Sequence, residues 1–222
     1  MTVVAIDGPA GSGKSTIAAA LAERLGVAHV DTGAYYRAAT LAVLRSGIDL
    51  RDGAGCARVI GDLTIERRLG RTLLNGVDVE DDIRGPEVTA NVSAVSAHPA
   101  VRAALLGAQR AAVSPAGAVV EGRDAGSVVV PDADLKVWLT ASPLERAARR
   151  AAQVGTADAN AITTHADSIK RRDADDATQM LRSADAIELD TTGVAIEEIV
   201  SRLVRLAQQA QQRAGTAAGD RT

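Results

Sequence analysis

The chain has 222 residues, a formal net charge of −3 and no phenylalanine. This slight negative charge argues against a protein that binds duplex nucleic acid by neutralising its phosphates. The single cysteine, Cys56, excludes an internal disulfide, and no apolar run reaches the roughly 18 residues that a membrane helix needs. With no secretory segment at the start, we expect a protein of the cytoplasm without a membrane or nucleic-acid partner.

The first part of the chain alternates short apolar strands with helices. The β-branched run Thr2–Asp7 predicts a buried strand, and the apolar spacing of Ser15–Leu25 predicts a helix that stops at Gly26. A second strand is expected over Val27–Val30 and a second helix over Gly33–Ser46. This rhythm is typical of a parallel sheet with helices on both faces.

The middle of the chain breaks this alternation. Three short strands are expected there, over Leu63–Glu66, Arg71–Leu74 and Val77–Val79. Asn75-Gly76 is a strong hairpin signal between the last two. A helical stretch follows over Glu87–Val113, with a break at Pro99. We therefore predict an α+β insert of about residues 60–113, carried by a body of about residues 1–59 and 114–207 within one unit.

The alternation resumes after the insert. Strands are expected over Ala118–Glu121, Leu135–Leu139 and Ala186–Asp190, and helices over Pro143–Gln153 and Ala195–Gln211. The segment Gly155–His165 is polar and weakly patterned, so we expect it to be mobile, while Ser168–Asp176 is a charged helix or loop. The low-complexity residues 208–222 predict a frayed tail.

The clearest motif is a glycine-rich loop after the first strand. Residues 8–15, GPAGSGKS, match G-x-x-x-x-G-K-[ST], and a strand precedes them and a helix follows. Glycines let the backbone N–H groups surround an anion at a helix N-terminus. Lys14 would reach the β- and γ-phosphates of ATP, and the Ser15 hydroxyl would be a ligand of Mg²⁺. The residues expected to contact ATP are Gly8, Pro9, Ala10, Gly11, Ser12, Gly13, Lys14, Ser15 and Thr16.

A phosphate loop alone does not name the reaction. A GTPase would carry an N-K-x-D motif for the base, and a transporter-type ATPase would carry L-S-G-G-Q; neither occurs in the sequence. The length and the inserted segments favour a kinase that acts on a small acceptor.

Two further loops follow predicted strands. Asp31 to Arg37 reads DTGAYYR, and Glu121 to Asp124 reads EGRD. Because ligands of a doubly wound sheet bind beyond the carboxyl ends of its strands, we expect both loops to face the crevice of the phosphate loop. The Thr32 hydroxyl and Arg37, one turn later, suit an acceptor phosphate.

With these loops, the chain resembles the bacterial cytidylate kinases from about Val3 to Asp190. The resemblance is carried by DTGAYYR at 31–37, the run Ala90–Arg110, EGRDAGSVVVPDADLKVWL at 121–139 and RRDADD at 171–176. It implies transfer of phosphate from ATP, with Mg²⁺, to CMP and dCMP. It also implies an α/β, three-layer phosphate-loop kinase with a five-stranded parallel sheet, an α+β insert that binds the nucleoside monophosphate (NMP), and a short arginine-rich lid at about 151–180.

The resemblance also implies roles for single residues around the phosphates and the sugar. Arg37 and Arg123 would hold the CMP phosphate, and Thr32 would lie beside it. Arg172 and Asp176 would hold the sugar hydroxyls. The catalytic residues implied are Lys14, Arg37, Arg123 and Arg172, which orient the phosphates and neutralise their charge.

The base would be read by three further residues. Ser93 and Arg102 match the family's contacts to cytosine, and Asp124 matches the carboxylate that accepts from the cytosine amino group. A carboxylate at that place accepts from cytosine and repels the O4 acceptor of uracil.

The sequence departs from the family in the lid. Gln179 stands where a phosphate-binding arginine is expected, and Arg182, Arg149, Arg150 or Arg171 would have to replace it. Two alternatives therefore stay open: a kinase for another small acceptor, such as UMP or a shikimate-like molecule, and a nucleotide-binding protein with weak catalysis. We expect a monomer.

Overall fold

The computed structural model describes residues 2–153, 155 and 159–219. The chain divides into two compact units. Unit 1 combines Met1–Val30 with Val113–Thr222, and unit 2 is Asp31–Ala112. The start of unit 2 differs from the predicted start of the insert at about residue 60.

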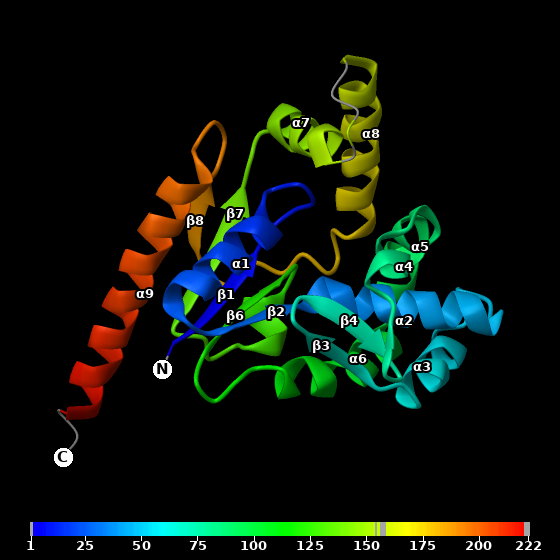
Figure 1. The fold of residues 1–222 in the computed structure, drawn as a ribbon, viewed down its shortest axis with the longest axis horizontal. Coiled ribbons are helices and arrows are strands. Elements are labelled where there is room, and N and C mark those ends of the chain that lie inside the picture. Colours follow the sequence, from blue (N-terminus) through cyan, green and yellow to red (C-terminus); the bar gives the residue numbers. More distant parts are fainter. Residues whose placement is uncertain (1, 154, 156–158, 220–222) are drawn as a thin grey trace. The chain divides into compact units, whose positions relative to one another are not determined.

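Unit 1 is built on a five-stranded parallel sheet (Figure 1). Its order is β2 (Ala28–Asp31), β6 (Ala118–Gly122), β1 (Val3–Asp7), β7 (Leu135–Thr140) and β8 (Ile187–Asp190). The central strand β1 pairs in parallel with both neighbours, so that Val4 lies beside Val119 on one side and Leu135 on the other. The expected α/β fold with a five-stranded parallel sheet is confirmed.

Two helices cover one face of this sheet. α1 (Lys14–Leu25) packs against α9 (Ile196–Gly219), which lies next to β7 (Figure 1). Val4 and Ile6 of β1 share a buried cluster there with Ile17, Leu21 and Leu203. Each of these side chains stabilises the fold by about 1.5–3 kcal/mol through burial of apolar surface.

The opposite face of the sheet is also buried. Ala5 and Val120 point to that side and are fully buried. The short π-helix η1 (Ala125–Val129) lies against it, and a Cβ at Gly126 would be 3.2 Å from the Cβ of Ala5. The chain therefore turns tightly straight after β6, where the expected EGRD loop lies.

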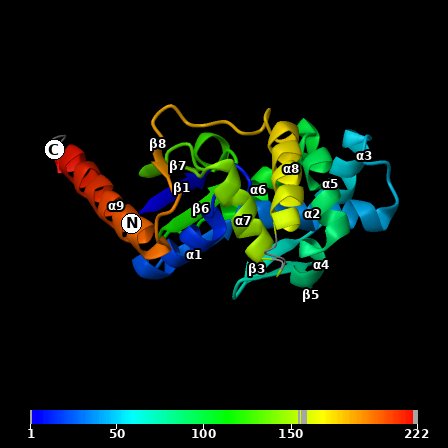
Figure 2. The ribbon, with the colours of Figure 1, turned by 90° about the horizontal axis from the view of Figure 1, so that it is seen from above.

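The predicted helix over Pro143–Gln153 is confirmed as α7, whereas α8 (Ala159–Asp175) and α9 are longer than the sequence predicts. α7 and α8 lie side by side (Figures 1 and 2). No helix was predicted over 155–165, whereas 159–165 belong to α8, because packing against α7 favours a helix there. The predicted mobility of this segment stays a prediction, and residues 156–158 lie outside the described residues. α9 extends to Gly219 and so includes much of the tail from residue 208; the fraying of this tail stays a prediction, and 220–222 lie outside the described residues.

Unit 2 combines five helices with a three-stranded antiparallel sheet in its described residues. The helices are α2 (Thr32–Ser46), α3 (Gly53–Gly61), α4 (Glu80–Arg84), α5 (Pro86–Ser96) and α6 (Pro99–Ala111). The strands are β3 (Ile65–Arg68), β4 (Arg71–Leu74) and β5 (Val77–Asp78). The predicted hairpin and the predicted break at Pro99 are confirmed, whereas α3 and α4 have no counterpart in the prediction.

Packing explains why unit 2 begins at Asp31. α2 contacts α5, α3 and α4, and α3 contacts α6. Because α2 buries most of its residues against these helices, it belongs with them and not with the sheet. In the described part of the chain, no helix is long and apolar enough to cross a membrane.

Candidate nucleotide-phosphate site

The phosphate loop joins β1 to α1 in unit 1. Gly8 has a φ of 150°, and a Cβ there would come within 2.1 Å of the carbonyl oxygen of Leu139. Gly13 precedes α1 in the left-handed region, with a φ of 87°. Only glycine meets both demands without strain, so these two positions fix the course of the loop.

Lys14 lies across this loop. Its Nζ donates to the carbonyl oxygen of Pro9 at 2.7 Å and to Ser12 Oγ at 3.4 Å, and the residue is 7% exposed. Burial, and next the positive charge of Arg123, lower the pKa of Lys14 well below its ordinary value. An anion bound in the loop would counteract both effects and raise the pKa of Lys14, so the site suits a phosphate ligand.

Asp7 ends β1 with a buried carboxylate. Its Oδ1 accepts from the N–H of Ala125 at 2.7 Å, and its Oδ2 accepts from the N–H of Gly126 at 2.8 Å. Burial raises the pKa of Asp7 from 3.8 to about 6, although the two N–H groups lower it. Asp7 thus ties the start of the phosphate loop to the turn after β6.

This pKa predicts a pH dependence of stability. Because the pKa of Asp7 is raised in the folded state, its contribution is complete below about pH 4 and is lost as the pH rises through about 6. Between pH 4 and 7, we expect the free energy of unfolding of the wild type to fall by about 2 kcal/mol relative to Asp7→Asn. Urea unfolding of both proteins measures this difference, and a difference that is constant with pH would contradict the prediction.

Two arginines and an aspartate form a cluster beside the loop. Arg123 donates through Nε to Asp176 Oδ2 at 3.1 Å and through Nη1 to the carbonyl oxygen of Gly8 at 3.2 Å. Arg172 Nε lies 3.9 Å from the same Asp176 oxygen and has no hydrogen-bond partner among the described residues. Burial, and next the charge of Arg123, lower the pKa of Arg172. The sequence placed these three residues in the site, and the structure brings them together.

A second arginine–aspartate pair holds the loop from α7 and α8. Asp173 Oδ1 accepts from the N–H of Ala10 at 3.1 Å, and Arg146 Nη1 donates to the carbonyl oxygen of Ala10 at 3.0 Å. Arg146 and Asp173 also form an ion pair with each other. Both side chains are mostly buried, and together they hold the backbone of Ala10 through its N–H and through its carbonyl oxygen.

Arg149 is the second arginine of α7 that contacts the loop. Arg149 Nη1 donates to the carbonyl oxygen of Ser12 at 3.3 Å and to Thr191 Oγ1 at 2.9 Å. Four guanidinium groups (those of Arg123, Arg146, Arg149 and Arg172) are thus gathered at the phosphate loop. Arginine suits this place because its planar, permanently charged group binds phosphate in a bidentate way.

The expected metal ligand Ser15 has a carboxylate beside it. Ser15 Oγ donates to Glu121 Oε2 at 2.8 Å. Mg²⁺ prefers oxygen ligands and is bound through one or two protein groups plus substrate phosphates. A hydroxyl and a carboxylate at the mouth of the loop fit this ion, while the described residues contain no cluster of three or more His, Cys, Asp or Glu that could hold a metal by themselves.

Asp124, the expected reader of the cytosine amino group, is 5% exposed and lies at the start of η1. Its negative charge contributes to the raised pKa of Asp7, which places the two carboxylates near each other. Asp124 therefore belongs to the same part of unit 1 as the phosphate loop.

Unit 2 carries the other expected acceptor residues on three helices. Arg37 donates from Nη1 to the carbonyl oxygen of Ile83 at 3.0 Å and to Thr89 Oγ1 at 2.9 Å. The guanidinium of Arg102 lies over the ring of Tyr36, 5.3 Å from its centre. Thr32 is buried at the start of α2, and Ser93 is half-buried on α5, one turn after Thr89.

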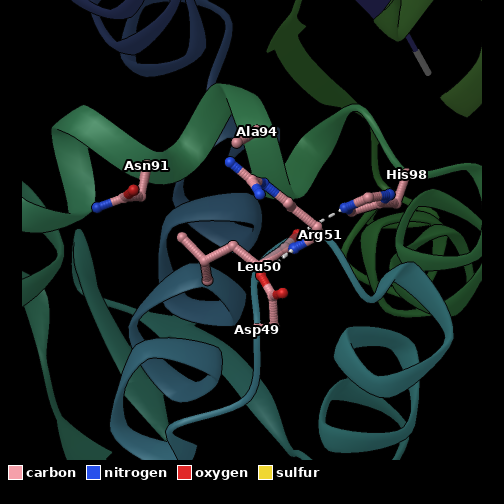
Figure 3. Close-up of a pocket in the computed structure, with 6 residues that line it drawn as sticks. All are labelled: Asp49, Leu50, Arg51, Asn91, Ala94 and His98. Atoms are coloured by element: carbon pink, nitrogen blue, oxygen red, sulfur yellow. Dashed lines mark hydrogen bonds between the residues drawn. The ribbon is translucent and has the colours of Figure 1, made fainter.

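An open cavity of about 510 Å³ in unit 2 contains none of these expected residues (Figure 3). Asp49, Leu50, Arg51, Asn91, Ala94 and His98 line it. His98 Nε2 donates to the carbonyl oxygen of Leu50 at 2.7 Å, so His98 holds the chain between α2 and α3.

The structure also shows where Gln179 and the arginines that could replace the missing lid arginine lie. Arg182 pairs with Glu188 and donates to the carbonyl oxygen of Ala186, so it is held at β8. Gln179 is 8% exposed, and its Oε1 finds no hydrogen-bond partner among the described residues. Of the arginines that the sequence offered as replacements, Arg149 lies at the loop. Arg146, Asp173 and Thr191 were given no role by the sequence. The charge and spacing of residues 145–150 hinted at Arg146, and Asp173 lies within the run RRDADD that carries the resemblance.

Comparison with known proteins bears on the family of this chain. A family model described as cytidylate kinase matches residues 4–209. The cytidylate kinase of Mycobacterium leprae (strain Br4923) is 45% identical over 213 residues, which cover 93% of this chain and 96% of that protein. The cytidylate kinase of Streptomyces avermitilis is 41% identical over 217 residues, covering 93% of each.

Other relatives are longer than this chain. A bifunctional pantoate ligase/cytidylate kinase of Synechococcus sp. (strain CC9605) is 46% identical over 214 residues, which are 91% of this chain. This chain spans only 44% of that relative's length. The crystal structure of TT1252 from Thermus thermophilus aligns with 93% of this chain at 19% identity and a TM-score of 0.47, a likeness too low to carry an argument.

Proposed function

This chain belongs to the cytidylate kinase family, and we propose that it transfers the γ-phosphate of ATP to CMP and dCMP. The observation that carries the proposal is the phosphate loop with Lys14 across it and four guanidinium groups around it. Buried N–H groups of Arg146 and Arg172 lack an acceptor among the described residues, which suits an anionic ligand.

On the donor side, the residues act by position and charge. The N–H groups of the loop and of the first turn of α1 would bind the β-phosphate, since they have no partner within the helix. Lys14 would leave the carbonyl oxygen of Pro9 and turn to the phosphate oxygens. The arginines from α7 and α8 would neutralise the charge that develops during transfer and exclude water from the γ-phosphate.

Mg²⁺, when bound with ATP, would supply charge neutralisation on the phosphate oxygens. Ser15 and Glu121 are the residues that would hold it, because their oxygens lie together at the mouth of the loop. The Ser15 hydroxyl can keep donating its hydrogen to Glu121, because its oxygen still has lone pairs for the ion.

On the acceptor side, the residues named from the family would bind the nucleoside monophosphate. Arg37 and Arg123 would hold the phosphate of CMP, and Arg172 and Asp176 would hold its sugar. The acceptor oxygen is already anionic near neutral pH, so no residue is needed as its general base.

Formation of CDP from ATP and CMP tests the proposal directly. We expect turnover with CMP and dCMP and far less with UMP, AMP or shikimate, measured as ADP release and by chromatography of the products. Preference for another acceptor would overturn the cytidine assignment. Tight binding of ATP and CMP without any CDP would instead favour a binding protein with weak catalysis, as Gln179 in the lid allows.

The role of Asp124 gives a sharper prediction. Asp124→Ala should raise the KM for CMP by about 10²-fold and change the KM for ATP less than threefold, because only the acceptor loses a hydrogen bond to a charged group. Steady-state kinetics with each substrate varied in turn measures the split. Asp132→Ala, which removes an exposed carboxylate beyond η1, serves as the matched control. Equal changes in both KM values would contradict the assignment.

We also propose that the protein acts in the cytoplasm as a monomer. Nucleotides are small cytoplasmic substrates, and the proposed chemistry is complete within one chain. Sedimentation equilibrium at several concentrations tests the monomer, and a concentration-dependent mass would contradict it.

A further inference from the structure

Side chains from two other elements, Ser15 of α1 and His29 of β2, contact Glu121 of β6. Ser15, in the first turn of α1, donates from Oγ to Glu121 Oε2 at 2.8 Å. His29, on the neighbouring strand β2, lies with Nε2 at 2.9 Å from Glu121 Oε1. The Glu121 side chain is 4% exposed and that of His29 is 25% exposed, so the contact is largely shielded from water.

The chemistry of the contact fixes which atom donates. An ionised carboxylate only accepts hydrogen bonds, so His29 must carry a hydrogen on Nε2 and donate it. Each oxygen of Glu121 is therefore engaged by a different donor, one from α1 and one from β2. A buried carboxylate is costly unless it is hydrogen-bonded, and two donors on opposite oxygens also define the plane of the group.

Glu121 has another group close by that could attract it. Its negative charge acts to raise the pKa of Lys14, against the effect of burial, so the ammonium group of Lys14 lies within its electrostatic reach. Without a donor on Oε1, the carboxylate could rotate towards this charge and leave Ser15. If Glu121 paired with Lys14, the lysine would not be available to the phosphates of ATP. The carboxylate would also have no oxygen beside Ser15.

We propose that His29 is a positioning residue. It holds Glu121 through Oε1, so that Oε2 stays beside the Ser15 hydroxyl, at the place where these two residues would hold the Mg²⁺ of Mg-ATP. Hydrogen bonds of this kind from a residue behind a metal ligand orient the ligand and raise its affinity for the metal. The inference rests on the proposed function and adds to it a residue that no motif of the phosphate loop contains.

Binding of the ATP analogue AMP-PNP, measured by calorimetry with and without Mg²⁺, tests this role without turnover. In the wild type we expect Mg²⁺ to tighten binding. In His29→Ala we expect about a tenfold loss of that gain, with binding in the absence of Mg²⁺ changed less than twofold. His29→Gln, whose amide can donate to Glu121, should keep most of the gain.

A double-mutant cycle adds a second check. Glu121→Gln should lose the gain as His29→Ala does, and the double variant should lose little more, because both changes remove the same oriented carboxylate. His98→Ala, in unit 2, is the matched control and should keep the gain. Thermal unfolding of each variant identifies any that no longer fold.

The outcomes separate this inference from the proposed function. If AMP-PNP does not bind to the wild type at all, the proposed function fails. If it binds and Mg²⁺ gives no gain, or His29→Ala keeps the gain, or His29→Gln loses as much as His29→Ala, the role of His29 is overturned while the kinase assignment stands.

Discussion

Replacing Lys14 with alanine is expected to lower kcat for CDP formation by about 10³-fold. The buried Nζ lies across the phosphate loop, and no other lysine of the chain is part of that loop. Loss of this charge leaves the developing negative charge on the transferred group less well neutralised, so the effect should fall on kcat and less on the KM for ATP.

The control for Lys14→Ala is Arg24→Ala. Arg24 lies in the last turn of the same helix, is half exposed and pairs with Glu197, so its removal also deletes one positive charge from α1. It should leave kcat within about twofold of the wild type, as surface substitutions generally do. Near-normal turnover of Lys14→Ala in the same assay would contradict the assignment of the ATP site to the phosphate loop.

Arg123→Ala is expected to lower kcat/KM for CMP by about 10²–10³-fold. Arg123 joins the carbonyl oxygen of Gly8 to the buried carboxylate of Asp176, so it links the phosphate loop to the predicted acceptor residues of unit 1. Without it, Asp176 loses its 3.1 Å ion pair with Arg123, and the phosphate loop loses its link to Asp176. Loss of CMP affinity and loss of turnover should therefore occur together.

The conservative and control variants sharpen this test. Arg123→Lys should recover little, because an ammonium group cannot replace the planar fork that reaches two acceptors. Arg205→Ala, an exposed arginine of α9 in the same unit, should behave as the wild type. Full activity of Arg123→Lys would mean that charge alone matters at this position.

The strands and helices that the sequence predicted well are those with a local signal. β1, α1 and the loop between them follow from a β-branched run, a helical apolar period and glycines at fixed spacing. The hairpin at Asn75-Gly76 and the break at Pro99 likewise need only their own residues. The helix over 159–165 was not predicted, because it depends on packing against α7, which the composition of the segment does not reveal.

The residues of the candidate site also divide into those that the sequence could name and those that it could not. The residues of the phosphate loop could be named from their motif, and Thr32, Arg37, Ser93, Arg102, Arg123, Asp124, Arg172 and Asp176 from their resemblance to the family; their roles in binding remain predictions. The contacts of the loop with its partners could not be predicted, since Asp173 lies 163 residues from Ala10 and Arg149 lies 137 residues from Ser12. The sequence offered Arg149 only as one of several replacements for the lid arginine, and it assigned no role to Asp173 within RRDADD.

What the sequence determined by itself is the phosphate loop, the parallel sheet and the family. These depend on which backbone conformations the glycines allow and on the period of apolar residues, and both are properties of short stretches of the sequence. The tertiary structure decided which charges surround the loop, where unit 2 begins, and that His29 contacts Glu121. Those contacts join residues far apart in sequence, so they exist only once the strands have paired and the helices have packed.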